Sequence, residues 1–485
     1  MDINKSKCIL LTVADEKTGL GHLFRTDALA QAIQNSGLLQ TELVIACREG
    51  KSWLRQKAPQ TDYCLQNWNC HADDVKEAIS GAAIIVVDAY DIGVEVWDEL
   101  RNSHALLAVF DDTGEKPHFC GVLINGGPGA HLVSYRKIPG QELLLGTEYQ
   151  VLRPPFWEGT PRIVSDRIKS VLLMAGGTDH SQVIDSIVDI ACKVLDAEAD
   201  IRVIGTQKTF VDARVTSLGF LSAAQLKQEF DAADMLITAA GQTVAEAVSC
   251  SLPCIMLQTI GNQAKNVQGW RKHGVAQYAG KTSDDIWRKQ LERGISVLNS
   301  KKQRSKQVEN AKSLAINDST RKLTIRLLVE ICQSVPFFTL SEQEKEMVFA
   351  WRNYESVRRW MDNPECIEWD NHLAFINGLQ QRNDKKYYLV KAGTLYLGII
   401  NLVDIDEKKK VAELGVYKNP ELHSVNIGRL LMLVLEKNAL KLRINTLRLK
   451  VRLNNKVAIN LYRNCNYQEV SNDQDYQYMI KEISR

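Results

Sequence analysis

Runs of consecutive apolar residues, rather than alternating ones, dominate about the first 300 positions of the chain. One series of such runs comprises CILLTVAD (8–15), TELVIACREG (41–50), AAIIVVDAYD (82–91) and LLAVFDD (106–112). A second series comprises SVLLMAGGTDH (170–180), DIRVIGT (200–206), DMLITAA (234–240) and SLPCIML (251–257). Strands that are apolar along their whole length are typical of parallel sheets covered by helices on both faces. The pattern therefore predicts two such sheets, one for each series.

The segments between these runs support the same prediction. After residue 180, five apolar residues have the spacing of a core-facing helical stripe: Val183, Ile187, Ile190, Ala191 and Val194. The proline-bearing segment QVLRPPFWEGTPR (150–162) joins the two series. We expect an α/β architecture of two Rossmann-like lobes, residues 1–155 and 156–300, with ligands bound between them beyond the carboxyl ends of the strands.

The pattern changes in the last third of the chain. Residues 301–335 are rich in lysine and arginine and predict a basic helical linker, although a nucleic-acid patch is the alternative. The strands KKYYLVKAGTLYLGIINLVDID (385–406) and VAELGVYKNP (411–420) follow one another with only turn residues between them. This spacing predicts an antiparallel sheet. We expect residues 336–485 to form a separate α+β domain.

Composition narrows the class of protein. Of the 485 residues, 45% are hydrophobic and 24% charged, which is typical of a globular chain with about three domains. The net charge of +2 argues against a nucleic-acid or anionic-membrane partner. No apolar run approaches the ~20 residues of a membrane span, and no signal-peptide pattern opens the chain, so we expect a cytoplasmic location. The eleven cysteines lack zinc or redox spacings, so no metal is expected.

The stretch TGLGHLFRTDALAQAI (18–33) brings chemistry to the end of the first predicted strand. Its glycine turn, which includes Gly21, lets a ligand approach the backbone, and the amides of the following helix suit a phosphate. His22 falls on the first turn of that helix, with Arg25 one turn later. The positive end of a helix disfavours an imidazolium, which leaves the ring able to accept a proton. The alternative is a structural, hydrogen-bonded histidine.

A parallel arrangement occurs in the second lobe, where TAAGQTVAEAVSCSLPCIML (238–257) predicts a strand, a glycine turn, a helix and another strand. Thr243 and Glu246 match a capping box. The functional interpretation is that the helix start holds a diphosphate and Glu246 binds ribose hydroxyls. In GNQAKN (261–266), Asn262 and Gln263 supply amides that orient a sugar or water, or else are turn residues.

Six motifs in order carry a specific resemblance over residues 8–290: GLGHLFRTDALA, VVDAYD, VFDDTGEKPHFC, LLGTEYQVLRPPF, MAGGTDH and ITAAGQTVAEAVSCSLPCIML…GNQ. They resemble the UDP-sugar hydrolase of pseudaminic acid biosynthesis, a family with a GT-B-type, two-lobed fold. The resemblance implies removal of UDP from UDP-2,4-diacetamido-2,4,6-trideoxy-β-L-altropyranose. A glycosyltransferase with the same fold is the alternative. The chain departs from the pattern of the hydrolase family at Ala89 and in NGGPGAHL (125–132), and these positions bear on sugar selectivity.

This resemblance also assigns roles to residues. It implies that His22 activates water at the anomeric carbon and that Asn262 lies beside the reaction centre. It further implies a UDP-sugar-binding set that consists of Gly21, Arg25, Gly177, Gly241, Gln242, Thr243, Glu246 and Gln263.

The last domain resembles the GNAT N-acetyltransferases, whose glycine-bearing turn binds the CoA diphosphate and whose N-x-x-A-x-x-L-Y motif follows. The second motif is present as Asn455, Ala458, Leu461 and Tyr462. The turn HSVNIG (423–428) has asparagine at the first glycine position, and the usual Gly-Phe after the last helix is Asn466-Tyr467. Asparagine tolerates the left-handed conformation best among non-glycine residues, so both changes can keep the backbone path.

The GNAT resemblance implies that Tyr462 is the general acid that protonates the departing CoA thiolate. The implied acetyl-CoA-binding residues are Val416, Tyr417, His423, Asn426, Ile427, Gly428, Arg429 and Asn455. The motifs WRN (351–353), RRWM (358–361) and GVYKNP (415–420) also resemble the acetyltransferase of the pseudaminic acid pathway, which acetylates the 4-amino group of a UDP-4-amino-4,6-dideoxy sugar. The alternative is a docking or sensor module without catalysis. We therefore expect a bifunctional enzyme whose partners are a UDP-amino sugar and acetyl-CoA.

Overall fold

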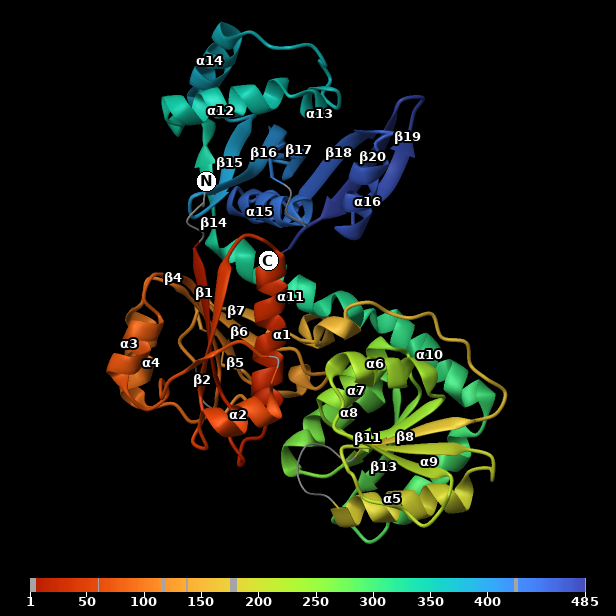
Figure 1. Cartoon of the computed structure of the whole chain (residues 1–485). Coiled ribbons are helices and arrows are strands. Elements are labelled where there is room, and N and C mark those ends of the chain that lie inside the picture. The colour runs from red at the N-terminus through yellow and green to blue at the C-terminus, as the bar shows by residue number, and fades with distance from the viewer. Residues whose placement is uncertain are drawn as a thin grey trace. The chain divides into compact units, whose positions relative to one another are not determined.

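The computed structural model describes residues 6–59, 61–115, 118–136, 138–174, 181–422 and 426–484. The chain divides into two compact units. One consists of Cys8–Ile33 and Thr41–Thr324, and the other of Met1–Lys7, Gln34–Gln40 and Ile325–Arg485. Figure 1 shows the elements of both in chain order.

The first unit begins with a seven-stranded sheet of order β3-β2-β1-β4-β5-β6-β7. Its strands are β1 (Lys7–Val13), β2 (Gln40–Ala46), β3 (Cys64–Leu65), β4 (Ala82–Asp88), β5 (Leu106–Phe110), β6 (Val122–Asn125) and β7 (Glu142–Leu145). The ladder from β4 to β7 is parallel throughout, as is the β2–β3 pair. The helices are α1 (Gly21–Asn35), α2 (Lys51–Lys57), α3 (Ala72–Ala78) and α4 (Val94–Asn102). Figure 1 shows α1 and the α3–α4 pair on opposite sides of this sheet.

A second, six-stranded sheet of order β10-β9-β8-β11-β12-β13 is parallel at every pair. Its strands are β8 (Ser170–Met174), β9 (Asp200–Ile204), β10 (Val215–Gly219), β11 (Met235–Ala239), β12 (Cys254–Gln258) and β13 (Ala276–Lys281). The helices are α5 (Ser181–Val194), α6 (Ala223–Ala232), α7 (Gln242–Ser249), α8 (Ala264–His273) and α9 (Trp287–Leu298).

Alternate residues of these strands belong to two different cores. Leu236 lies in one hydrophobic cluster, and its neighbour Ile237 lies in the other. Both faces of the sheet are therefore buried, which explains why the strands read as continuous apolar runs. On α5, Ile187 and Ala191 of the predicted stripe are buried in the second of these clusters.

The basic stretch after residue 300 forms α10 (Lys301–Leu314), followed by α11 (Ser319–Ile331). Arg304 on α10 is fully buried. Its guanidinium donates hydrogen bonds to the carbonyls of Leu298 at 2.5 Å and Ser165 at 2.6 Å. The sequence suggests an exposed arginine at this position, but its guanidinium is buried and provides hydrogen-bond donors for buried backbone carbonyls.

Glycines bring the two sheets of the first unit together at one seam. A Cβ on Gly129 would lie 2.2 Å from the Lys265 carbonyl oxygen, and one on Gly127 would lie 2.9 Å from Asn266 Oδ1. From the other side, a Cβ on Gly269 would lie 2.3 Å from the Pro128 carbonyl carbon. The glycine-rich loop after β6 thus packs backbone to backbone against α8, a contact that no larger residue permits.

The second unit contains a seven-stranded sheet of order β14-β15-β16-β17-β18-β20-β19. Its strands are β14 (Cys332–Pro336), β15 (Lys386–Ala392), β16 (Leu395–Asp406), β17 (Val411–Lys418), β18 (Thr446–Arg452), β19 (Gln468–Asn472) and β20 (Tyr476–Glu482). The helices are α12 (Glu342–Asn353), α13 (Glu355–Arg358), α14 (Trp369–Gly378), α15 (Ile427–Lys441) and α16 (Lys456–Asn464). All neighbouring strands are antiparallel except β17 and β18, which are parallel. This is the mixed sheet of an α+β domain.

Candidate functional site

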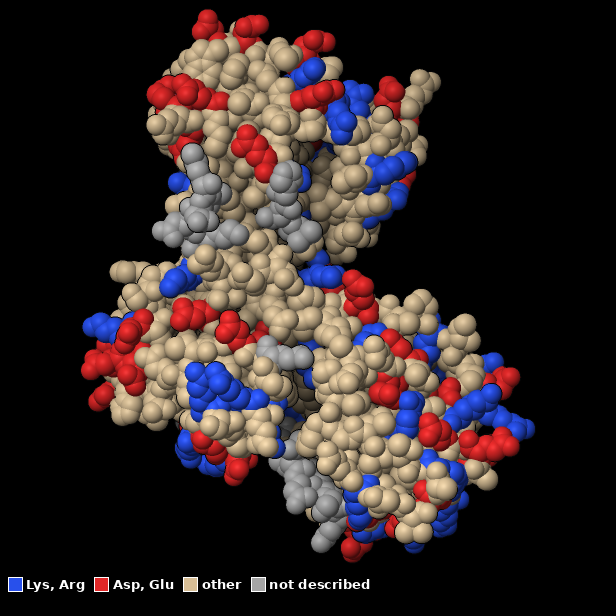
Figure 2. Space-filling model, viewed as in Figure 1, with Lys and Arg blue, Asp and Glu red and all other residues tan. Residues whose placement is uncertain are grey.

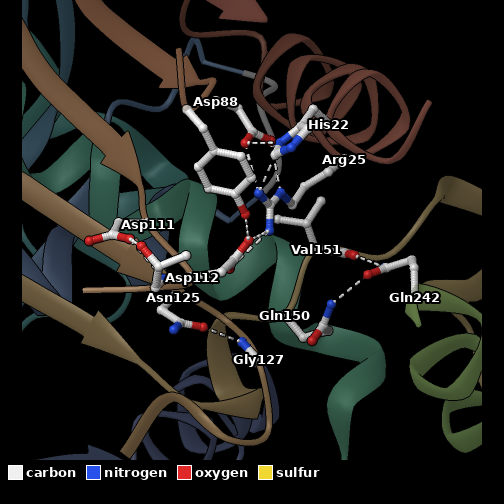
Figure 3. Close-up of polar contacts among 12 residues, drawn as sticks. His22, Arg25, Asp88, Asp111, Asp112, Asn125, Gly127, Gln150, Val151 and Gln242 are labelled. Carbon is white, nitrogen blue, oxygen red and sulfur yellow. Dashed lines mark hydrogen bonds and ion pairs between the residues drawn. The ribbon is translucent and has the colours of Figure 1, made fainter. Parts of the chain in front are cut away.

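The first turn of α1 and the end of β4 form a compact polar cluster, drawn in Figure 3. His22 Nδ1 lies 2.6 Å from Asp88 Oδ1. Arg25 donates to both oxygens of the same carboxylate, through Nη2 at 2.7 Å and Nε at 2.8 Å. The Thr26 hydroxyl lies 3.3 Å from the carboxylate as well. The Asp88 side chain is only 1% exposed, so these contacts replace its hydration.

A second carboxylate extends the cluster from the end of β5. Arg25 Nη1 donates to Asp112 at 2.9 Å, and the Tyr90 hydroxyl donates to Asp112 at 3.0 Å. The Tyr90 ring meets the His22 ring edge-on, with the centroids 4.8 Å apart. The imidazole is therefore held by a carboxylate on one edge and an aromatic ring beside it, and its side chain keeps 12% exposure.

The charges in the cluster are mutually stabilised. Burial alone would raise the pKa of Asp88, but the Arg25 guanidinium and the His22 ring outweigh burial and hold that pKa well below its usual range. Burial, together with the nearby Asp112 charge, raises the pKa of Tyr90, so its phenol stays protonated. Because Nδ1 of His22 faces a carboxylate, that nitrogen carries the proton in the neutral ring and Nε2 is left as the acceptor.

Three members of this cluster were not among the predicted site residues: Asp88, Tyr90 and Asp112. The signal for them was present, because VVDAYD and VFDD each place an acid directly after a buried strand. Since β4 and β5 are adjacent and parallel, their carboxyl ends meet at one edge of the sheet. His22 and Arg25, predicted from the glycine turn, are brought to that same edge.

The predicted capping box at the start of α7 is wrong. Gly241 is the N-cap of this helix, without a side-chain cap, and Thr243 lies inside the helix. The Glu246 carboxylate is bound instead by Arg153 of the interlobe segment, with Nε at 2.6 Å and Nη2 at 2.8 Å. A bidentate, charge-assisted pair outcompetes a single cap hydrogen bond, and it leaves Glu246 only 1% exposed.

The other amides around this turn are also engaged. Gln242 Nε2 donates to the Val151 carbonyl at 2.5 Å, and Gln150 donates to Gln242 Oε1 at 2.9 Å, as Figure 3 shows. Gln263 Oε1 accepts from the Thr259 amide at 2.9 Å, which is the turn role that the sequence left open. Gln242 thus ties the second lobe to the interlobe segment.

The predicted glycines at the two helix starts leave free space. A Cβ built on Gly21 or Gly241 would meet no atom within 4 Å. Room beside a helix N-terminus is what a phosphate needs. Asn262 lies in the 3-10 turn η4 (Gly261–Gln263), and Gly177 lies outside the described residues.

In the second unit, β17 and β18 pair over only three residues, from Val411↔Thr446 to Glu413↔Arg448. Beyond that point the strands diverge, while β17 remains paired with β16. The predicted residues Val416 and Tyr417 lie in the diverging part of β17, where the backbone edge toward β18 has no strand partner. An extended ligand can add to such an edge.

Helix α15 begins beside this opening. Asn426, its N-cap, has φ 64° and ψ 7°, and Asn466 also has φ 64°. Both asparagines therefore adopt the left-handed conformation, which asparagine tolerates in place of glycine. The Asn426 residue is exposed, and the predicted His423 lies outside the described residues.

The predicted residues that follow Asn426 and those at α16 have packing roles as well. Ile427 is 2% exposed, so its side chain belongs to the core, and Arg429 lies on the same first turn of α15. A Cβ on Gly428 would lie 2.9 Å from Leu461 Cδ2, so this glycine also permits close packing of α15 and α16. The Asn455 side chain caps α16 by accepting from the Ala458 amide at 3.1 Å.

Tyr462, the predicted general acid, is 8% exposed on α16. Burial raises its pKa to about 12, so the phenol holds its proton at neutral pH. Its ring centroid lies 6.1 Å from that of Tyr467.

Among the residues that the structure describes, no group of three or more His, Cys, Asp or Glu side chains has the arrangement of a metal site. None of the helices in the described part of the chain is long and apolar enough to span a membrane.

Comparisons with known proteins identify the class of the second unit. Residues 350–467 match the acetyltransferase (GNAT) family. Acetyltransferase PseH of Campylobacter jejuni is 33% identical over 144 residues, which are 30% of this chain and 88% of the relative. The crystal structure of that organism's N-acetyltransferase PseH in complex with acetyl coenzyme A is 30% identical, covers 32% of this chain and 99% of that one, and has a TM-score of 0.27.

The divergent strands and the matched segment thus identify the second unit as an acetyltransferase domain. The chain belongs to the acetyltransferase (GNAT) family through its C-terminal domain. The predicted co-substrate, acetyl-CoA, is confirmed with it. An uncharacterized protein of Methanocaldococcus jannaschii is 19% identical over 437 residues, covering 82% of this chain and 84% of the relative, and so extends over both units.

Proposed function

We propose that the C-terminal domain transfers the acetyl group of acetyl-CoA to the 4-amino group of a UDP-4-amino-4,6-dideoxy sugar in pseudaminic acid biosynthesis. The observation that carries this proposal is the 33% identity to the acetyltransferase PseH over 88% of its length. The unpaired edge of β17 at Val416 and Tyr417 supports it, because an extended pantetheine arm would complete the open ladder there.

The acetyl transfer needs one bond made and one broken. The amine nitrogen attacks the thioester carbonyl, the new N–C bond forms, and the C–S bond breaks. The departing thiolate takes the proton of Tyr462, whose phenol is protonated at neutral pH. The proton lost by the amine returns through water to the phenolate. We infer that Glu413, part-exposed on β17, relays that proton on its way to the phenolate.

We infer that the first unit hydrolyses UDP-2,4-diacetamido-2,4,6-trideoxy-β-L-altropyranose to UDP and the free sugar, with its lobes as a GT-B-type pair. The contact of 2.6 Å between His22 Nδ1 and Asp88 carries this inference. It leaves Nε2 free to take a proton from water. The water oxygen then bonds to the anomeric carbon as the bond to the UDP oxygen breaks. Gly21 and Gly241 have room for phosphate oxygens at the helix starts.

The two reactions are consecutive, because acetylation at the 4-amino group produces the diacetamido sugar that the hydrolase consumes. One experiment tests both. The full chain is given the UDP-4-amino sugar and acetyl-CoA, and the products are followed by NMR. We expect the acetylated UDP-sugar first, then UDP and the free diacetamido sugar.

Two variants assign the steps. His22→Ala should stop the reaction at the acetylated UDP-sugar, and Tyr462→Phe should slow its formation. Release of UDP only after a sugar acceptor is added would contradict hydrolysis and favour the glycosyltransferase. Acetyl-CoA binding without acetylation of the UDP-amino sugar would contradict the first proposal.

A further inference from the structure

Strand β18 presents basic side chains on one face. Its residues alternate between the core and the surface. The buried set is Leu447, Leu449 and Val451. The opposite set is Arg448, Lys450 and Arg452. Figure 2 shows Lys and Arg side chains, with some Asp and Glu side chains among them, in the region of β18, β20, α13 and α16.

These cations lie on the face of the sheet that carries α12 and α14. Arg448 pairs in register with Glu413 of β17 and shares its face. Tyr417, four residues along β17 on the same face, packs against the α12–α14 core cluster. Helix α15 covers the other face, where Leu431 would lie 2.8 Å from a Cβ on Gly398. The basic face is therefore opposite α15, whose N-terminus is the place expected for the diphosphate of CoA.

Lys450 and Arg452 also lie in the divergent part of β18. The last pair with β17 is Glu413↔Arg448, so both residues come after the strands separate. With CoA expected at the N-terminus of α15, the face opposite α15 is the one left for the substrate amine. Lys450 and Arg452 border that approach.

The charge of this face is only partly balanced. Arg448 has two carboxylates near it, Asp404 at 3.5 Å and Glu413 at 3.8 Å. Lys450 pairs with Asp362 at 3.0 Å and also feels the charge of Glu413, and its side chain remains 36% exposed. Arg452 makes no ion pair among the described residues, and its buried Nε has no hydrogen-bond partner there. The surplus positive charge is at the divergent end.

An aromatic ring completes the patch. Tyr476 of β20 pairs in register with Arg452. Its ring centroid is 5.3 Å from Arg452 Cζ and 5.6 Å from Lys450 Nζ. Two cations beside a flat ring form a surface that suits a phosphate group joined to a planar base.

We propose that Lys450 and Arg452 bind the diphosphate of a nucleotide-linked acetyl acceptor, with Tyr476 beside the nucleoside. This assignment rests on the proposed acetyl transfer to a UDP-amino sugar and gives the acceptor its anchor. A lysine supplies a mobile point charge and an arginine a planar fork, which together match the two phosphates. Asp362 would stay as the second partner of Lys450.

Steady-state acetylation by the full chain tests the anchor. Lys450→Gln combined with Arg452→Gln should raise KM for the UDP-amino sugar about tenfold or more, since each lost charge-assisted hydrogen bond weakens binding by about that factor. The affinity for acetyl-CoA and kcat at saturating acceptor should not change. Arg452→Lys should recover part of the loss. For the same amino sugar without UDP, the variant and the wild type should have equal KM. An unchanged KM for the UDP-amino sugar, or an equal rise for both acceptors, would overturn the proposal.

Lysine footprinting separates this proposal from the proposed function. Lys437 of α15 is a matched control, because its side chain is 37% exposed and pairs with Glu330 at 2.8 Å. An amine-reactive ester is applied to the full chain with and without UDP, and modification is read by mass spectrometry. UDP should slow modification of Lys450 and not of Lys437. If UDP protects Lys450 but the UDP-amino sugar is not acetylated, the diphosphate site at Lys450 and Arg452 is supported and the proposed acetyl acceptor is wrong. If Lys450 is modified equally with and without UDP, the proposed diphosphate site is wrong, even if the sugar is acetylated.

Discussion

Replacement of Asp88 by asparagine tests how the first unit prepares His22. The substitution keeps the side-chain shape but removes the charge that accepts from His22 Nδ1 and from Nε and Nη2 of Arg25. It also turns an amide donor toward one of these donors. The imidazole then loses the partner that fixes its ring and its tautomer.

The structure sets the size of the effect. Removal of one member of a buried ion pair costs about 3–5 kcal/mol, and because Arg25 keeps Asp112 as a partner at 2.9 Å we expect about 3 kcal/mol of unfolding free energy. The hydrogen bond to the ring is charge-assisted and contributes about 1.5–3 kcal/mol. If it acts mainly in the transition state, kcat for UDP release falls about 10- to 150-fold.

The assays are coupled UDP release without an acceptor and denaturant unfolding over a pH series. Since the pKa of Asp88 is held below its usual range, its charge stabilises the fold above the unfolded pKa of about 3.9, and that stability is lost as pH falls below it. The stability difference between wild type and Asp88→Asn should be constant from about pH 8 to 5 and shrink below about pH 4. Glu229→Gln, which breaks an ion pair with Arg202 elsewhere in the unit, should lose stability but keep kcat. A folded Asp88→Asn protein with wild-type kcat would refute the role assigned to this carboxylate.

Three further outcomes follow from local geometry. Tyr462→Phe should lower kcat for acetyl transfer about 100-fold or more and leave acetyl-CoA affinity by calorimetry unchanged, and an equal kcat would remove the phenol from the chemistry. Asn426→Val should cost about 1–2 kcal/mol in thermal unfolding because a β-branched residue resists φ 64°, whereas Asn426→Gly should not destabilise; equal losses would contradict this account. Gly129→Ala should cost about 2 kcal/mol or more in urea unfolding, because its Cβ would meet the Lys265 carbonyl at 2.2 Å, and wild-type stability would show that the loop yields.

The long buried strands could be predicted from the sequence, because both of their faces lie in hydrophobic cores and most of their positions are apolar. Short strands could not. β6 (Val122–Asn125) and β7 (Glu142–Leu145) have four residues each, too few to stand out from the surrounding loops. The burial of Arg304 was also hidden, because its partners are backbone carbonyls that tertiary packing brings to it.

The candidate site shows the same division. His22 and Arg25 could be predicted because the glycine turn and the helix that position them are contiguous in the sequence. Their partner Asp88 is 66 positions from His22, and only the pairing of parallel strands joins them. The local sequence predicts a cap role for Glu246, yet its partner Arg153 is 93 positions away. A local motif indicates which groups a side chain can bind, but the tertiary structure determines which of those groups lies next to it.

The loop after β6 and helix α8 meet through bare peptide groups at Gly129 and Gly269, and this has a consequence for the two lobes. At Gly129 and Gly269 any added side-chain carbon would overlap the facing backbone, so this loop and α8 keep their contact only while both positions stay glycine. A mutation at either position would therefore change the spacing between the two lobes rather than the packing inside one of them.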